Sequence, residues 1–224
     1  MLPDNLQAYY KLDGNSNSSV GSNNGSDTSI SYSTSYGYIN QGASFNGSPS
    51  NIQIALPTNF NNDFILSFRF YSGAEISGWN WFMNFNGYGS TGSGNGGMNI
   101  ATNSFKLRFS LGAWFNAVPS DYSSQATLSA NTWYIVTLTR ISNVYRVYVN
   151  GSQYGSNTNA TSDTFPTSGT FYFGKGPSTD WYGGYLDTVA FWSAGLSASD
   201  VSLLGSSGQY PFTVDSKGNF LSLF

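Results

Sequence analysis

The sequence contains no histidine and no cysteine, and Glu75 is its only glutamate. These absences exclude zinc sites built on imidazole or thiolate, cysteine nucleophiles, Ser-His-Asp triads and disulfide bonds. Only 8% of the 224 residues are charged, and the eight Lys and Arg residues are scattered along a chain of formal net charge −3. We therefore expect neither nucleic-acid binding nor insertion into a membrane.

The sequence also lacks long apolar runs. No apolar stretch approaches the roughly 18 residues that a membrane-spanning helix needs. The first residues, Met1 to Asp4, carry neither a basic segment nor the apolar stretch of a secretory leader. We therefore expect synthesis in a cytoplasm. Polar, tyrosine-rich sequences of low charge often function outside cells, so a virion surface reached by lysis is the predicted location. Export to the extracellular space or a cell surface is the alternative.

Glycine and aromatic residues are abundant, with 26 glycines and an aromatic content of 17%. Hydrophobic residues make up 39% of the chain, which is enough to pack a core. Five Asn-Gly pairs and one Asp-Gly pair punctuate the sequence, and such pairs favour the tight turns that join antiparallel strands. The composition excludes a helical bundle and predicts an all-β protein.

Alternation of apolar and polar residues predicts the strands. In the segment 64–71, Phe64, Leu66, Phe68 and Phe70 share one face while Arg69 points the other way. Strong patterns also occur at 104–109, 132–139 and 145–149, and shorter strands are predicted at 8–12, 43–45, 52–55, 81–85, 98–101, 171–173 and 185–192.

The sequence also predicts the buried residues of one strand and the position of one short helix. The strand 104–109 is expected to bury Phe105, Leu107 and Phe109. The segment 197–204 is predicted to form a short helix of about two turns, because Ser197 can cap its start and Gly205 can end it.

Several stretches then occur in a familiar order, namely Tyr9–Asn15, Gly42–Gly47, Phe64–Phe70, Asn131–Tyr134, Val147–Gly151 and Gly184–Trp192 followed by Leu196-Ser197. Over residues 6 to 205 this order resembles the laminin-G-like members of the concanavalin A-like lectin/glucanase superfamily. The resemblance implies a two-sheet antiparallel jelly-roll sandwich. We expect one such domain over residues 1–211 and a C-terminal tail over residues 212–224.

The superfamily includes glucanases, so the chain must be tested for catalytic carboxylates. Retaining glycosidases need two carboxyl groups about 5 Å apart, one as nucleophile and one as acid. Glu75 is the only glutamate and has no aspartate two residues later. We therefore predict that the protein is not an enzyme, and a glycoside hydrolase is the least favoured function.

The resemblance also implies a structural Ca²⁺, because many relatives carry one. The matching positions are Asp13 and Asp187, which a jelly roll would bring together at a sheet end. The chain has Asn17-Ser18-Ser19 where relatives often have a further acidic residue, so the charge of such a site is reduced. The alternative is that Asp13 forms a turn with Gly14 and Asp187 accepts hydrogen bonds from loop amides.

Aromatic side chains are the other candidate site residues, because sugars stack on ring faces and bind amides and carboxylates through their hydroxyls. The candidates in predicted loops are Trp79, Trp114, Tyr122, Trp181 and Tyr182. The alternative is that these rings merely cover the sheet ends. Trp133 and Trp192 are predicted to lie in the core, and so is Trp81, on one face with Met83 and Phe85.

The end of the chain is apolar, and Phe220, Leu221, Leu223 and Phe224 are expected either to dock on a partner subunit or to fold back on the sandwich. Together these features predict a non-catalytic surface-recognition protein, an exposed phage or viral component such as a capsid decoration or fibre protein. Its expected partners are further copies of itself, capsid or tail proteins, and cell-surface glycans. A carbohydrate-binding module or adhesin of a cell-surface protein is the alternative.

Overall fold

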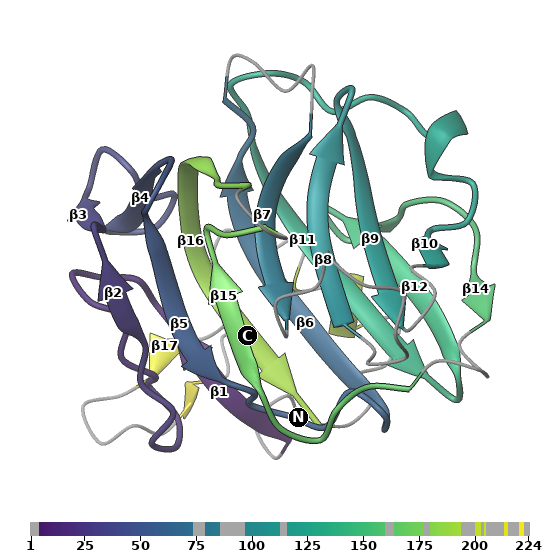
Figure 1. The fold of residues 1–224 in the computed structure, drawn as a ribbon, viewed down its shortest axis with the longest axis horizontal. Helices are drawn as coiled ribbons and strands as arrows, with labels where there is room; N and C mark the ends of the chain where they lie inside the picture. The colour runs from purple at the N-terminus through teal and green to yellow at the C-terminus, as the bar shows by residue number, and fades with distance from the viewer. Residues whose placement is uncertain are drawn as a thin grey trace.

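The computed structural model describes residues 5–73, 79–85, 97–112, 116–159, 164–176, 180–193, 200–202, 204, 213–214 and 220–221. In this part of the chain the strands form two large antiparallel sheets, stacked as two layers (Figure 1). The predicted all-β jelly-roll sandwich is confirmed.

The first layer, sheet A, has nine strands among the described residues. Its order is β13 (Ser152–Gln153), β12 (Val144–Val149), β11 (Trp133–Ile141), β6 (Phe64–Tyr71), β16 (Gly183–Trp192), β4 (Gly42–Asn46) and β3 (Ser31–Ser33), while β1 (Leu6–Tyr10) pairs with β16 and β14 (Thr158–Asn159) with β12.

The second layer, sheet B, has seven strands among the described residues. Its order is β10 (Asn116–Val118), β9 (Lys106–Gly112), β8 (Gly97–Asn103), β7 (Asn80–Phe85), β15 (Thr170–Phe173), β5 (Asn51–Ala55) and β2 (Ser26–Thr28). A short 3₁₀ helix, η1 (Tyr122–Ser124), lies between β10 and β11.

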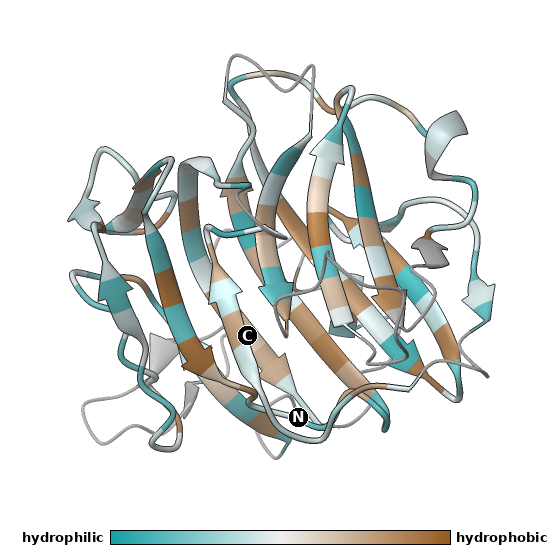
Figure 2. Ribbon diagram, in the orientation of Figure 1, coloured by the Kyte–Doolittle hydropathy of each residue, from teal (hydrophilic) through white to brown (hydrophobic). Residues whose placement is uncertain are grey.

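The core lies between the layers and is built by alternation. β6 has the predicted bounds and places Phe64, Leu66, Phe68 and Phe70 in the core. Figure 2 shows the same alternation as brown and teal bands along β5. Burying each such apolar side chain stabilises the fold by about 1.5–3 kcal/mol. A smaller cluster that includes Ile65, Ile135, Trp192 and Leu204 covers part of the outer face of sheet A, and it confirms Trp192 as a buried residue.

The structure changes the predicted start of one strand and agrees with the predicted helix where it is described. The strand predicted at 104–109 begins instead at Lys106, because Ser104 and Phe105 form a turn with φ values of 50° and 60°. Phe105 is consequently half-buried and is not the core residue predicted, whereas Leu107 and Phe109 are buried. Asp200 to Ser202 and Leu204 are helical as predicted, and residues 197–199 lie outside the described residues.

The C-terminal tail contributes a third, two-stranded sheet in which β17 (Thr213–Val214) pairs with β18 (Phe220–Leu221). The side chains of Phe220 and Leu221, and all of Leu223 and Phe224, lie outside the described residues. The division into residues 1–211 and 212–224 therefore stays a prediction. Within the described chain, no helix has the length and apolar character needed to cross a bilayer.

Two glycines test the tightness of the packing between β15 and β4. Gly174 and Gly47 both have positive φ, 81° and 85°, but a methyl group on Gly174 would overlap the Phe45 ring, whereas one on Gly47 would meet open space. We expect Gly47→Ala to lower the free energy of unfolding by about 1 kcal/mol, and Gly174→Ala by about 2–4 kcal/mol, because overpacking is added to the backbone penalty. Urea unfolding followed by tryptophan fluorescence measures both, and equal losses would contradict the close contact with Phe45.

Candidate functional site

Two tryptophans stack at the start of β7. The rings of Trp79 and Trp81 lie within 10° of parallel, with centroids 4.9 Å apart. Trp79 is 44% exposed, a high value for so large an apolar side chain. The guanidinium carbon of Arg108, on β9, lies 5.3 Å from the Trp79 ring centroid, which is a cation–π distance. The Trp79 ring is therefore held between contacts with Trp81 and Arg108, and part of it stays open to solvent.

A β-bulge explains why Trp81 faces outward. The register between β7 and β8 shifts between Trp81, which pairs with Ala101, and Met83, which pairs with Ile100. Phe82 and Met83 are consequently both buried in the core, and Trp81 is only half-buried on the opposite face. The prediction that Trp81 shares the core face of Met83 and Phe85 is therefore wrong.

Trp181 contributes to a second group on the same face of sheet B. It forms an isolated β-bridge with Lys175, whose Nζ lies 5.3 Å from the Trp181 ring centroid and 4.8 Å from that of Tyr172 on β15. Gly176, the next residue, lies directly against Trp81, because a Cβ at this position would collide with the Trp81 side chain. The two groups thus adjoin. We call them together the aromatic surface: Trp79, Trp81, Arg108, Tyr172, Lys175 and Trp181.

Amide side chains continue the aromatic surface across sheet B. Tyr172 pairs with Gln53 on one side and Asn84 on the other, and Asn84 pairs with Asn99. Gln53 Nε2 donates to the Tyr172 hydroxyl at 3.0 Å, and Asn84 Nδ2 donates to Asn99 Oδ1. Asn84 and Asn99 are buried, so Gln53 is the exposed amide of this row that can hydrogen-bond the hydroxyls of a sugar stacked on the surface.

Other predicted sugar-binding residues are placed differently. Tyr182 is fully buried, its hydroxyl donates to the carbonyls of Tyr71 and Tyr185, and burial raises its pKa. The prediction of Tyr182 as a sugar-binding residue is therefore wrong, because its side chain is directed inward against Phe45. The side chain of Tyr122 and the whole of Trp114 lie outside the described residues.

Trp133 was predicted to lie in the core, and this prediction is wrong as well. Tyr134 and Val136 point into the core, so alternation places Trp133 on the outer face of sheet A, where it is half-buried. Its neighbours there are Tyr38 and Tyr71, with ring centroids 6.1 and 5.6 Å away.

Asp13 and Asp187 both hold the loop between β3 and β4. The fully buried Asp187 accepts hydrogen bonds at Oδ2 from the amides of Tyr38 and Ile39, at 2.7 and 2.8 Å. Asp13 Oδ1 accepts one from the amide of Gln41 at 2.9 Å. Burial raises the pKa of Asp187 to about 6, although the two amides and the Arg69 guanidinium act to lower it.

This geometry fits the loop-amide role better than a calcium cage. Among the described residues, no three His, Cys, Asp or Glu side chains converge as metal ligands. Asp187 also lies opposite Arg69 in the β16–β6 register, and a guanidinium disfavours a second cation nearby. Calcium binding at Asp13 and Asp187 stays a prediction.

The raised pKa of Asp187 makes the free energy of unfolding depend on pH, and the direction of that dependence follows from the shift. Between the ordinary value of 3.8 and about 6, the folded chain keeps a proton that the unfolded chain has released, so stability falls as pH rises through this window. Asp187→Asn keeps an oxygen acceptor for both amides but cannot titrate. We expect the free energy of unfolding of wild type, relative to Asp187→Asn, to fall by about 1–3 kcal/mol from pH 4 to pH 7. Urea unfolding at a series of pH values checks this, and parallel profiles would contradict it.

Comparison with known proteins identifies the family of this chain and solved structures of similar fold. Residues 46–202 match a family model described as the concanavalin A-like lectin/glucanases superfamily. No curated protein matches the sequence. Similar solved structures include domain 4 of AbnA, a GH43 extracellular arabinanase from Geobacillus stearothermophilus, in complex with arabinotriose. It is 18% identical, has a TM-score of 0.69, and the match covers 88% of this chain and 97% of that domain.

Two further similar structures belong to longer chains. The binding domain of Paraclostridial Mosquitocidal Protein 1 is 16% identical with a TM-score of 0.69, and the match covers 92% of this chain and 52% of the other. Trypanosoma rangeli sialidase is 17% identical with a TM-score of 0.68, and the match covers 90% of this chain and 33% of the other. At these identities the likeness to solved structures concerns the fold alone. The family match, which spans most of the chain, shows that this protein belongs to the concanavalin A-like lectin/glucanases superfamily.

Proposed function

We propose that the protein is a carbohydrate-recognition domain and that the aromatic surface of sheet B is its binding site. The observation that carries the proposal is the stacked pair of Trp79 and Trp81, in which Trp79 is 44% exposed. A flat aromatic face of this kind matches the apolar face of a pyranose or furanose ring.

The surroundings of the stack supply the polar half of sugar recognition. Arg108 and Lys175 are held against ring faces, so their N–H groups are positioned before a ligand arrives. Asp180 adjoins the same surface, because its backbone carbonyl accepts from the amide of Gly176 at 2.9 Å. Both hydrogen-bond donors and acceptors are therefore present beside the rings, as a polyhydroxyl ligand requires.

The similar structures support a binding role. The arabinanase domain is described in complex with arabinotriose, and the mosquitocidal protein is matched through its binding domain. The arabinanase is described as extracellular, which agrees with an extracellular or cell-surface location. Arabinotriose is therefore the first neutral probe to use.

We propose binding without turnover. Most retaining and inverting glycosidases use a pair of carboxyl groups on either side of the scissile bond. The only glutamate, Glu75, lies outside the described residues, and Asp180 is the one carboxylate that the described residues place beside the aromatic surface.

Replacing Trp79 tests the site directly. We expect Trp79→Ala to weaken binding of arabinotriose, or of any neutral glycan that a glycan array detects, by roughly tenfold or more, because a stacked aromatic anchor is lost. Isothermal titration calorimetry measures the affinity. The matched control is Tyr38→Ala, which removes the other strongly exposed aromatic ring among the described residues but lies in the loop between β3 and β4 of sheet A, so binding should not change. An equal effect of both substitutions, or of neither, would refute this site.

We also propose that the protein is attached to a particle surface through its C-terminal tail, and removal of the tail tests this. A particle-surface protein could be attached through the apolar tail, and the tail strand β18 pairs with β17 in a sheet separate from sheets A and B. We expect a chain that ends at Pro211 to keep its melting temperature but to lose any oligomer that the full chain forms. Light scattering and thermal unfolding of both chains check this. A truncated chain that melts several degrees lower, with unchanged mass, would show instead that the tail packs on its own sandwich.

A further inference from the structure

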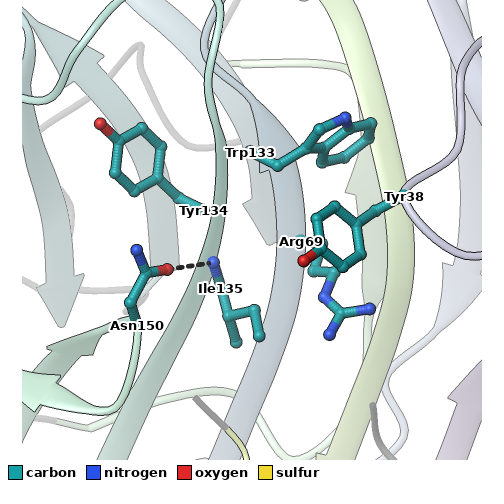
Figure 3. A pocket seen from close by; sticks show the side chains of 6 residues that line it. All are labelled: Tyr38, Arg69, Trp133, Tyr134, Ile135 and Asn150. Carbon is teal, nitrogen blue, oxygen red and sulfur yellow. Dashed lines mark hydrogen bonds between the residues drawn. The ribbon is translucent and has the colours of Figure 1, made fainter. Parts of the chain in front are cut away.

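A pocket of about 210 Å³ opens on sheet A, on the outer face opposite to the aromatic surface. It is lined by Tyr38, Arg69, Trp133, Tyr134, Ile135 and Asn150 (Figure 3). Its volume is below the roughly 300–1,000 Å³ of sites for drug-sized ligands, so it suits one sugar unit and not an oligosaccharide.

The walls of the pocket are aromatic and aliphatic. Trp133 is half-buried, and the Tyr38 ring meets it edge-on with the two centroids 6.1 Å apart. Tyr134 and Ile135 are each 9% exposed. The Tyr134 hydroxyl accepts a hydrogen bond from the amide of Ser129 at 2.6 Å, so this residue offers the pocket its ring. A ligand that fills the pocket must therefore carry an apolar group.

Arg69 is part of the lining, but we assign it no hydrogen bond to a ligand. Its side chain is only 1% exposed, and Figure 3 shows the guanidinium beneath the Tyr38 ring, whose centroid is 4.5 Å from the guanidinium carbon. Asp187 is the cross-strand neighbour of Arg69, and the guanidinium charge acts on its carboxyl group. Because an acidic and a basic group already face each other beside the pocket, it suits a neutral ligand.

Asn150 supplies an accessible hydrogen-bond donor. This exposed residue is tied twice to Ile135, because its backbone amide donates to the Ile135 carbonyl at 2.8 Å and its Oδ1 accepts from the Ile135 amide at 3.0 Å. The two bonds fix the plane of the side-chain amide, and Figure 3 shows Oδ1 turned to Ile135 and Nδ2 turned away from it. The pocket thus combines apolar walls with one amide donor whose direction is set before a ligand arrives.

We propose that this pocket binds a neutral sugar that carries an acetamido group, such as an N-acetylglucosamine or N-acetylgalactosamine unit. The acetamido carbonyl accepts from Asn150 Nδ2, and the acetamido methyl group packs against Trp133 and Ile135. A hydroxyl in the same place leaves the apolar walls uncovered, so a sugar without the acetamido group binds more weakly. The site is a second binding point of the domain, and it does not depend on the aromatic surface of sheet B.

The probes are sugars that differ only in the acetamido group. We would titrate ¹⁵N-labelled protein with the methyl β-glycosides of N-acetylglucosamine and of glucose, and then with those of N-acetylgalactosamine and of galactose. The indole N–H resonance of Trp133, assigned by its loss in Trp133→Phe, reports on the pocket. We expect at least one acetamido sugar to shift this resonance with a millimolar dissociation constant, and its counterpart without the acetamido group to bind about tenfold more weakly or not at all.

Removing the donor of Asn150 provides a matched test that preserves the fold. Asn150→Asp keeps the acceptor for Ile135 and a turn sequence, Asp-Gly, that suits the same hairpin, but it has no side-chain N–H. It should weaken the acetamido sugar by about tenfold, because the carbonyl of the sugar then meets a carboxylate. Asn143→Asp, at the opposite end of the same two strands, adds the same charge, keeps its acceptor for Arg140 and should leave binding unchanged. Trp79→Ala should also leave it unchanged, which separates this site from the aromatic surface.

Three results would overturn the proposal. The first is no shift of the Trp133 resonance with either acetamido sugar at tens of millimolar. The second is equal binding of the sugars with and without the acetamido group, which would remove the basis for the ligand class. The third is that Asn150→Asp weakens binding no more than Asn143→Asp does, and loss of binding in Trp79→Ala would then assign the ligand to sheet B.

Discussion

The alternation of side chains along the strands is the constraint on which the rest of the structure depends. Each sheet can give only every second side chain to the shared core, and in β6 these are Phe64, Leu66, Phe68 and Phe70. Everything else that the strands carry must lie on an outer face. Arg69 is there because its neighbours in the strand belong to the core. The aromatic surface is consequently built on the outer face of sheet B, and the core beneath it holds its strands in place.

Two β-bulges modify this rule, one beside the aromatic surface and one beside the loop between β3 and β4. In β7 the bulge after Trp81 returns Met83 to the core and leaves Trp81 outside, beside Trp79. In β16 a second bulge follows Asp187, so that Val189 returns to the core while Asp187 faces outward. The extra residue, Thr188, has a φ of 45°, which is uncommon for a β-branched side chain. Bulges of this kind redirect side chains, and here they place Trp81 in the aromatic surface and turn Asp187 toward the amides of the loop between β3 and β4.

The positions of the strands could be predicted from the sequence, but the face of the sheet on which a given side chain lies often could not. The bounds of β6 and the Asn150-Gly151 turn, with φ values of 49° and 79°, follow from local patterns alone. The prediction for Trp81 failed because a bulge leaves no mark in the sequence. The prediction that Trp133 lies in the core failed because its strand is apolar on both faces at this end. Tyr38 was not singled out, because its position depends on a hydrogen bond to Asp187, 149 residues away along the chain.

The few cations of the chain are held against aromatic rings on the outer faces of the sheets. Arg69, Arg108 and Lys175 are three of only eight cations, and each lies 4.5–5.3 Å from the centroid of an aromatic ring. A ring face attracts a cation and restricts its rotamers without neutralising it, so the donors lose less entropy when a ligand binds. The net charge of −3 generates little long-range attraction for anions, and specificity for a charged group must therefore come from short-range contacts.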